Sequence, residues 1–282
     1  MPDDKRKQKK ESRRNFKRLL VLADTHIGHR AGLALPDLWK PLAAIHGPKY
    51  GKIGEQGYKA YQAKIDELKP FDYLILNGDI IDGPGIKSAG GQGSELILPS
   101  INQQIEYAGK LIKNLNIDPT KTLMTYGTPY HVGQHFEAEK TIANEIGCKI
   151  KSQLFFKING FEFNVRHQAG SHSYIPTTRA QPLVKEWLSN LLWKQFDRQP
   201  QADVIIRSHV HYHFAVCQPS KKNQMWWGIF TPALQQASTK LGRRLSNVVH
   251  FGFIWFDIYE DYFTWDSDII WVEAAKEKSR EW

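Results

Sequence analysis

Cysteine and long hydrophobic runs are scarce in this sequence of 282 residues. The two cysteines, Cys148 and Cys217, sit in unrelated segments, which argues against a disulfide framework and fits a reducing compartment. No uninterrupted apolar stretch reaches the roughly 18 residues that a membrane-spanning helix needs. The charged N-terminus also lacks the apolar core of a signal peptide. We therefore expect a cytoplasmic protein with no membrane partner.

Basic charge is in excess and is unevenly spread along the chain. The net charge is +9 at pH 7, and residues 1–18 contribute +6 of it, from nine basic and three acidic side chains. This composition is typical of a mobile segment. We expect residues 1–17 to form a flexible N-terminal tail and residues 18–282 to form a single domain. The tail could attract nucleic acid through phosphate contacts, or it could serve solubility alone.

Short apolar runs predict β-strands at residues 18–23, 71–76, 122–126 and 202–206. Segments with helical periodicity lie between these runs, at residues 55–68, 101–115 and 182–196. Strands that alternate with helices predict an α/β sheet with short connections between strand and helix.

The second half of the chain has the pattern of antiparallel strands. Asn159-Gly160 separates strand-like runs at residues 154–158 and 161–165, which is a strong hairpin signal. Residues 251–259 and 262–265 predict another hairpin. We therefore expect a second, largely antiparallel sheet, packed face to face with the first, with helices on the outside of both.

Carboxylate and imidazole side chains follow the ends of the apolar runs. The residues concerned are Asp24, His26, Asp79, His167, His209 and His211. Such ligands suit manganese, iron or zinc. In each Asp-x-His or His-x-His pair, an extended backbone would send both side chains to the same side. One bridging carboxylate can hold two metals roughly 3.5–4 Å apart, and a hydroxide shared between them becomes a nucleophile at neutral pH.

Taken singly, each motif has a plain structural explanation as turn chemistry or as a partly buried histidine, but their order favours a metal site. The series Asp24-x-His26, Gly78-Asp79, His167 and His209-x-His211 resembles the calcineurin-like metallophosphoesterase superfamily over roughly residues 19–212. The resemblance implies an α/β fold, a four-layer sandwich of two mixed β-sheets flanked by helices, with a dinuclear metal centre.

The resemblance also implies roles for individual residues. Two divalent ions would be bound, with manganese expected first and iron or zinc as alternatives. Asp82 resembles a carboxylate that orients a ligating histidine. The metal ligands implied are Asp24, His26 and His211 for the first ion, Asp79 as the bridge, and His167 and His209 for the second ion.

One motif departs from the family pattern. The family has Gly-Asn-His where this chain has Gly127-Thr128-Pro129-Tyr130-His131, so the asparagine that would bind the second metal is missing. His131 could be the catalytic histidine that protonates the leaving oxygen, or it could fill the vacant ligand place, as could Thr128. A surface histidine after a Pro-Tyr turn is the alternative. Weaker candidates for phosphate contact, equally compatible with exposed histidines, are His172, His29 and His135.

Three functions fit these observations. We expect a metal-dependent phosphodiesterase, a nuclease acting on DNA or RNA, because the chain is basic, with a pI of about 9.3. A phosphatase for protein or small phosphomonoesters is the alternative, although Gly83-Pro84 stands where such enzymes usually carry a phosphate-gripping arginine. A degenerate nucleic-acid-binding module is the third, supported only by the altered motif. Two long loops, residues 28–54 and 83–93, are expected to border the site. The sequence does not indicate an oligomeric state.

Overall fold

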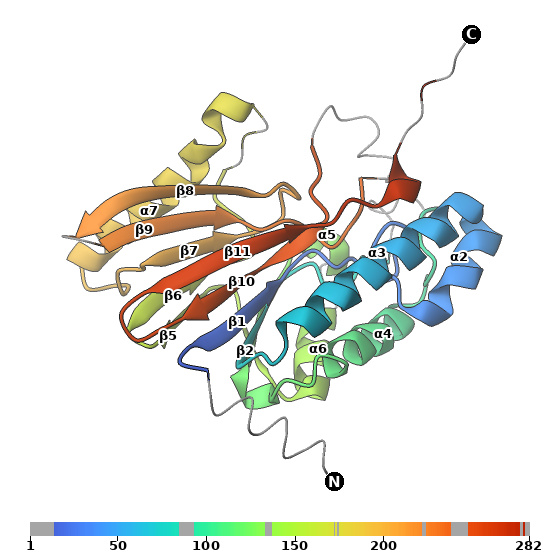
Figure 1. The fold of residues 1–282 in the computed structure, drawn as a ribbon, viewed down its shortest axis with the longest axis horizontal. Coiled ribbons are helices and arrows are strands. Elements are labelled where there is room, and N and C mark those ends of the chain that lie inside the picture. The colour runs from blue at the N-terminus through green and yellow to red at the C-terminus, as the bar shows by residue number, and fades with distance from the viewer. Residues whose placement is uncertain are drawn as a thin grey trace.

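Two β-sheets form the centre of the protein. The computed structural model describes residues 14–84, 93–132, 137–171, 173, 175–221, 224–237, 248–276 and 279. In this part of the chain a six-stranded and a five-stranded sheet pack face to face, and helices cover the outer face of each (Figure 1). The predicted α/β fold with two mixed sheets flanked by helices is therefore confirmed.

The six-stranded sheet has the order β11-β10-β1-β2-β3-β4, and β1 to β4 run parallel. Its strands are β1 (Lys17–Leu22), β2 (Tyr73–Asn77), β3 (Thr122–Thr125), β4 (Lys149–Lys151), β10 (Gly252–Ile258) and β11 (Phe263–Ile269). Strand β1 is buried on both faces: Leu20 and Leu22 pack under the helices, whereas Leu19 and Val21 pack between the sheets. This double burial explains why the last four residues of β1, from Leu19 to Leu22, are all apolar.

The five-stranded sheet has the order β5-β6-β7-β9-β8. Its strands are β5 (Leu154–Ile158), β6 (Phe161–Val165), β7 (Val204–Arg207), β8 (Phe214–Lys221) and β9 (Gln224–Phe230). The prediction of a largely antiparallel second sheet is wrong in two respects. Strand β7 pairs in parallel with both β6 and β9, and the late hairpin β10-β11 joins the first sheet beside β1.

The helices divide between the two sheets, as Figure 1 shows. Helices α3, α4 and α6 lie over the six-stranded sheet, α2 packs beside α3, and α7 covers the five-stranded sheet; the short α5 follows β3. Their bounds are α2 (Trp39–His46), α3 (Pro48–Leu68), α4 (Ile101–Lys113), α5 (Pro129–Val132), α6 (Ala138–Ile146) and α7 (Ala180–Gln195). Short 3-10 helices span Pro36–Leu38, Pro119–Lys121, Pro176–Thr178 and Glu273–Ala275.

The segment expected as a long loop at residues 28–54 is largely helical. Helix α3 begins at Pro48, directly after Gly47, whose φ of 97° a residue with a side chain rarely adopts. The helix expected at residues 55–68 is therefore longer than its periodicity indicated. Of the other loop, residues 85–92 lie outside the described residues.

Arg14, the first described residue, contacts the folded domain. Most of the predicted tail, residues 1–13, lies outside the described residues. Arg14 donates a 2.6 Å hydrogen bond to the carbonyl of Pro70 and lies 3.4 Å from Asp72 Oδ2. No helix in the described part of the chain is both long enough and apolar enough to cross a membrane.

Candidate metal centre

The carboxyl ends of five strands meet at one edge of the two sheets. The predicted site residues there are Asp24 and His26 after β1, Asp79 and Asp82 after β2, Thr128 and His131 after β3, His167 after β6, and His209 and His211 after β7. These residues lie beyond the strand ends, where the sequence predicts them. The arrangement brings together segments almost 190 residues apart in sequence.

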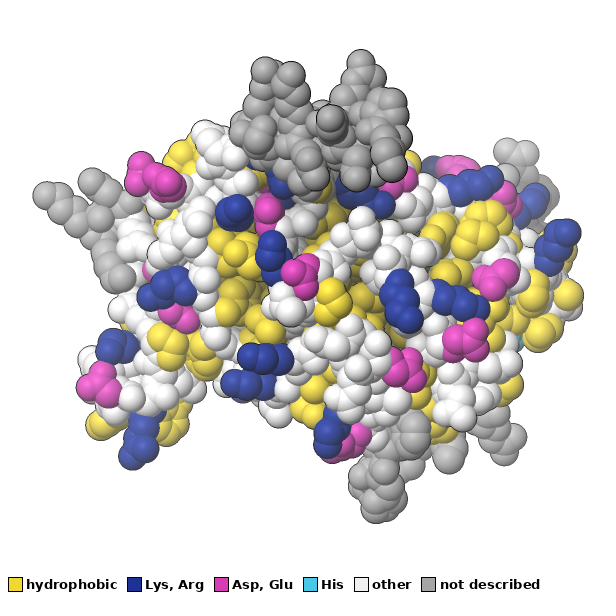
Figure 2. Space-filling view, turned by 90° about the horizontal axis from the view of Figure 1, so that it is seen from below, with side chains coloured by type: hydrophobic (Ala, Val, Ile, Leu, Met, Phe, Trp, Pro, Cys, Tyr) yellow, Lys and Arg dark blue, Asp and Glu magenta, His cyan; other side chains and the backbone are white. Residues whose placement is uncertain are grey.

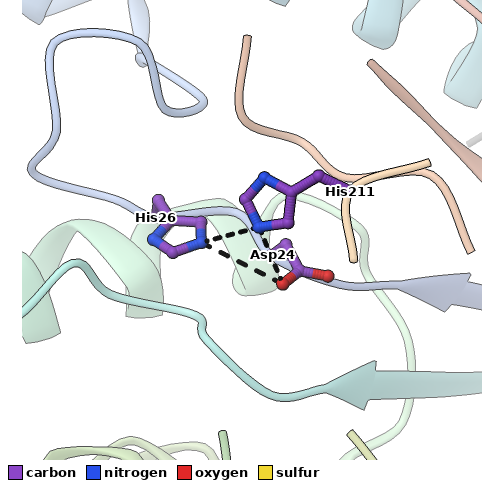
Figure 3. Close-up of side chains that lie close together, drawn as sticks. All are labelled: Asp24, His26 and His211. Atoms are coloured by element: carbon purple, nitrogen blue, oxygen red, sulfur yellow. Dashed lines mark hydrogen bonds and ion pairs between the residues drawn. The ribbon is translucent and has the colours of Figure 1, made fainter. Parts of the chain in front are cut away.

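Asp24, His26 and His211 form the first ligand group (Figure 3). The Nε2 atom of His211 lies 3.2 Å from Asp24 Oδ1, and the Nε2 atom of His26 lies 4.0 Å from the same oxygen. The two Nε2 atoms are 3.3 Å apart. Three donor atoms thus converge on one point, as a bound cation requires.

Asp79, His167 and His209 form the second ligand group. His167 Nε2 lies 3.0 Å and His209 Nδ1 3.8 Å from Asp79 Oδ2. The two groups touch, because His167 Nε2 is also 3.9 Å from Asp24 Oδ1. A third group, made of His26, Asp79 and His131, overlaps both, so Asp79 lies between the positions that the two groups define.

The ligand segments are not extended, contrary to the expectation from alternation. Five of the six predicted ligands have a positive φ: Asp24 (50°), His26 (41°), Asp79 (49°), His209 (72°) and His211 (57°). Non-glycine residues rarely adopt this left-handed conformation, and such strain clusters at functional sites. The backbone N–H groups of Asp24 and His26 donate to the carbonyls of Gly78 and Asp79, which holds the two turns in register.

Two acceptors orient the ligating imidazoles. His26 donates from Nδ1 to Asp82 Oδ1 at 2.9 Å, a contact that the predicted orienting role of Asp82 requires. His167 donates from Nδ1 to the Asn77 carbonyl at 2.6 Å. In both rings Nδ1 is therefore the nitrogen that donates to the protein, and Nε2 faces the other residues of its ligand group, as in a metal-bound histidine.

The turn of residues 127–131 holds the Asp79 carboxylate. Thr128 donates from its backbone N–H to Asp79 Oδ1 at 2.6 Å, and its Oγ1 lies 3.1 and 3.2 Å from the two Asp79 oxygens. Gly127 is required here, because a Cβ atom on it would lie 2.2 Å from Asp79 Oδ1. Thr128 is thus engaged with Asp79 through both its backbone and its side chain.

His131 lies on the side of the first ligand group. Its Nδ1 donates to the Asp82 carbonyl at 3.1 Å, and its ring stands edge-on to His26 with the centroids 4.5 Å apart. Its Nε2 is 3.7 Å from Asp79 Oδ2. His131 therefore groups with His26 and Asp79 and not with His167 and His209.

Buried polar atoms at the centre fit a bound cation. Asp24 Oδ1 and His167 Nε2 have no hydrogen-bond partner among the described residues, although both are buried. Burial disfavours a charge on His167, yet Asp79 and Asp24 raise its pKa to about 10. Burial would also raise the pKa of Asp79, but the charges on its histidine neighbours hold it well below its usual value. Without a cation, a proton on His167 offsets the two carboxylates.

Sequence reasoning missed Glu139 on α6. Its Oε1 accepts the Ile80 N–H at 3.2 Å and its Oε2 accepts the Gly127 N–H at 2.6 Å, so it joins the segments that follow β2 and β3. Burial and the nearby charge of Asp79 raise its pKa to about 7. Nothing in the helical sequence around Glu139 signals this role.

One of the three weaker phosphate-contact candidates, His29, lies in the described part of the chain. His172 and His135 lie outside the described residues. His29 is buried, with its Nε2 3.7 Å from Glu95 Oε2, and it is absent from the three ligand groups of the described chain.

Comparisons with known proteins were made by sequence and by structure. A scan against protein-family models and a search of curated proteins return no match. Similar solved structures include a single mutant of Vps29 from Entamoeba histolytica, with 14% identity, a TM-score of 0.44, and 89% of this chain and 91% of that chain covered.

Two further solved structures are enzymes by their names. A novel archaeal phosphodiesterase has 15% identity and a TM-score of 0.42, with 89% of this chain and 99% of that chain covered. A metallophosphoesterase from Sphaerobacter thermophilus has 11% identity and a TM-score of 0.40, with 89% and 88% covered. At this level of similarity, the function has to be inferred from the chain's own residues.

Proposed function

We propose that the chain is a dinuclear-metal-dependent phosphoesterase that hydrolyses phosphodiester bonds in DNA or RNA. The observation that carries the proposal is the position of Asp79, whose carboxylate belongs both to the group with His167 and His209 and to the group with His26 and His131. A carboxylate shared between adjacent ligand groups is what two closely spaced cations need. Oxygen and imidazole donors fit manganese, iron or zinc, and we expect manganese first.

The ligand residues would place the reacting phosphate. When bound, two divalent cations would supply a nucleophile from water at neutral pH and offset the charge on the phosphoryl oxygens. Asp24 and Asp79 provide buried negative charge at the centre, while Asp82 and Asn77 keep the rings of His26 and His167 aimed at it. The chain thus holds its ligands rigidly before any cation arrives.

His131 is assigned to the leaving group. Its Nδ1 is committed to the Asp82 carbonyl, so its Nε2 faces the ligand groups. A protonated ring in this position can donate to the oxygen that leaves the phosphorus. Because His131 groups with His26 and Asp79, we prefer this role to that of a ligand for the second ion.

Substrate would approach from the side of three histidines. The side chains of His209, His211 and His131 are 28%, 19% and 14% exposed, whereas those of Asp24, Asp79 and His167 are 2% exposed or less. The ligand groups are therefore open on one side and closed by the strand ends on the other.

Nucleic acid is proposed as the substrate on the basis of charge. The six basic side chains of residues 1–13 would contact phosphates outside the site. On the face shown in Figure 2, the described Lys and Arg side chains are interspersed with Asp, Glu and hydrophobic groups and form no large basic patch. The proposal therefore depends on the tail more than on that face.

The test is a manganese-dependent assay on paired substrates. Hydrolysis of bis(p-nitrophenyl) phosphate should exceed that of p-nitrophenyl phosphate, and labelled single- or double-stranded DNA or RNA should be cleaved. Faster hydrolysis of the monoester would support the phosphomonoesterase alternative. Metal analysis that finds no transition metal near stoichiometry after reconstitution would overturn both enzyme functions.

A further inference from the structure

Glu186 on α7 joins strands β6 and β7, which lead to His167 and to His209 of the second group. Its Oε1 accepts hydrogen bonds from Arg166 Nη2 at 2.7 Å and from the Gly170 N–H at 3.0 Å. Its Oε2 accepts from Arg207 Nη2 at 2.7 Å and from Arg207 Nε at 3.2 Å. Arg166 precedes His167 in sequence, and Arg207 lies two residues before His209.

The strand geometry links the contacts of Glu186 to the positions of His167 and His209. Strands β6 and β7 are parallel neighbours, and their pairing continues past both ends, because the Arg166 N–H donates to Ile206 and the Ser208 N–H to His167. Successive side chains point to opposite faces of a strand. The arginines point outward to α7, so His167 points inward to Asp79.

The ion network of Glu186, Arg166 and Arg207 lies largely inside the protein and not on its surface. The side chain of Arg207 is 1% exposed and that of Glu186 is 15% exposed. A buried ion pair contributes little net stability compared with apolar side chains of the same size, but removing one partner leaves a buried charge unpaired. The network is therefore better explained by the geometry that it imposes than by the stability that it adds.

The first ligand group is held by other contacts. Asp24 and His26 bond to the segment after β2, and the His211 carbonyl accepts the N–H of His250 at 2.8 Å. Among the described residues Glu186 makes no hydrogen bond to Asp24, His26 or His211, and His211 lies two residues further along the chain from Arg207 than His209 does. A change at Glu186 should therefore act on one ligand group more than on the other.

We propose that Glu186 is a positioning residue for the second metal ion, acting through Arg166 and Arg207 on His167 and His209. The inference depends on the proposed dinuclear site. Its consequence is selective: loss of Glu186 weakens binding of the second ion and leaves the first unchanged. A purely structural role would weaken both ions together.

The experiment is a manganese titration of metal-free protein by calorimetry, with electron paramagnetic resonance of the loaded forms. The variant is Glu186→Gln, and the control is Asp197→Asn, which makes the same change of acid to amide in an exposed ion pair with Lys194 just after α7. In Glu186→Gln the Kd of the first ion should stay unchanged and that of the second should rise by about 10- to 100-fold. The resonance signal of coupled ions should return at high manganese, and the control should match wild type.

The outcomes separate the two proposals. Equal weakening of both ions, or no change in either, would overturn the role of Glu186, whereas wild-type protein that binds no metal would overturn the proposed function. If Glu186→Gln does not fold, Arg166→Met removes only the more exposed arm of the network, whose side chain is 35% exposed. This variant should also weaken the second ion alone, and unchanged binding would contradict the inference.

Discussion

Thr128 holds Asp79 through two groups at once, its backbone N–H at 2.6 Å and its hydroxyl at 3.1 Å from the same carboxylate oxygen. Thr128 therefore supports the Asp79 carboxylate from the turn that follows β3. Glu139 supports the same turn from behind, because it accepts the N–H of Gly127. The Asp79 carboxylate is thus fixed by the turn after β3, which α6 supports in its turn.

Asp79→Ala should abolish the activity. The substitution removes the only carboxylate that the second ligand group contains and the side chain shared with His26 and His131. The rate of hydrolysis should fall by more than about 100-fold, which is the loss expected when only a hydrogen-bond partner of a metal ligand is changed. The measurement is diester hydrolysis with metal stoichiometry on the same samples. Asp66→Asn, in an exposed ion pair with Lys69, should behave as wild type, and full turnover by Asp79→Ala would show that the site is misassigned.

His131→Gln should slow the reaction according to the leaving group. If His131 protonates the leaving oxygen, hydrolysis of DNA, which releases a strongly basic alkoxide, should fall by about 10²–10⁴-fold. Hydrolysis of bis(p-nitrophenyl) phosphate should fall much less, because its leaving group needs little help from a proton. Both ions should remain bound. Equal losses on both substrates, with one ion lost, would assign His131 to metal binding.

Glu139→Gln should change the pH dependence of stability of the metal-free protein. Burial raises the pKa of Glu139 from 4.5 to about 7, so the folded state holds this proton more tightly than the unfolded state. The stability that the group contributes is present below pH 4.5 and is lost as the pH rises to about 7. The loss is on the order of 3 kcal/mol.

The comparison of wild type with the variant isolates this group from the other titrating residues. Chemical unfolding in a chelator at several pH values gives the two free energies of unfolding. Wild type should lose stability relative to Glu139→Gln between about pH 4.5 and 7, as the difference in proton binding requires. Parallel pH profiles would show that Glu139 is ionised in the folded protein throughout this range.

The position of the site was predictable from the sequence, but its backbone was not. Short apolar runs that end in Asp or His identify strand ends, and Asn159-Gly160 has positive φ angles of 46° and 87° in the predicted hairpin turn. The left-handed turns at Asp24 and His26 depend on hydrogen bonds from their backbone N–H groups to carbonyls of the segment that follows β2. No local pattern within residues 23–27 carries that information.

Partners that are distant in sequence account for the remaining differences. The hairpin β10-β11 was recognised, but its sheet is decided by pairing with β1, more than 230 residues away. Glu139 and Glu186 each look like an ordinary polar residue of a helix. Their roles arise only when α6 and α7 pack against the strand ends, which periodicity within a helix does not encode.

Removal of residues 1–13 should weaken nucleic-acid binding without changing the chemistry of the site. The deletion removes six basic side chains but keeps Arg14, which contacts Pro70 and Asp72 and so belongs to the folded domain. Each phosphate contact that is lost should reduce the slope of log K against log salt by about 0.9 on duplex DNA. Binding measured from low to moderate salt gives this slope.

The control is a tail of equal length with its basic residues changed to glutamine. It should reduce the salt slope of binding as the deletion does, because the charge of the tail and not its length drives nucleic-acid binding. Hydrolysis of bis(p-nitrophenyl) phosphate should be unchanged in both variants, since this small substrate needs only the ligand groups. An unaltered salt slope would mean that the tail does not contact phosphates, and the nucleic-acid substrate would then need another basic surface.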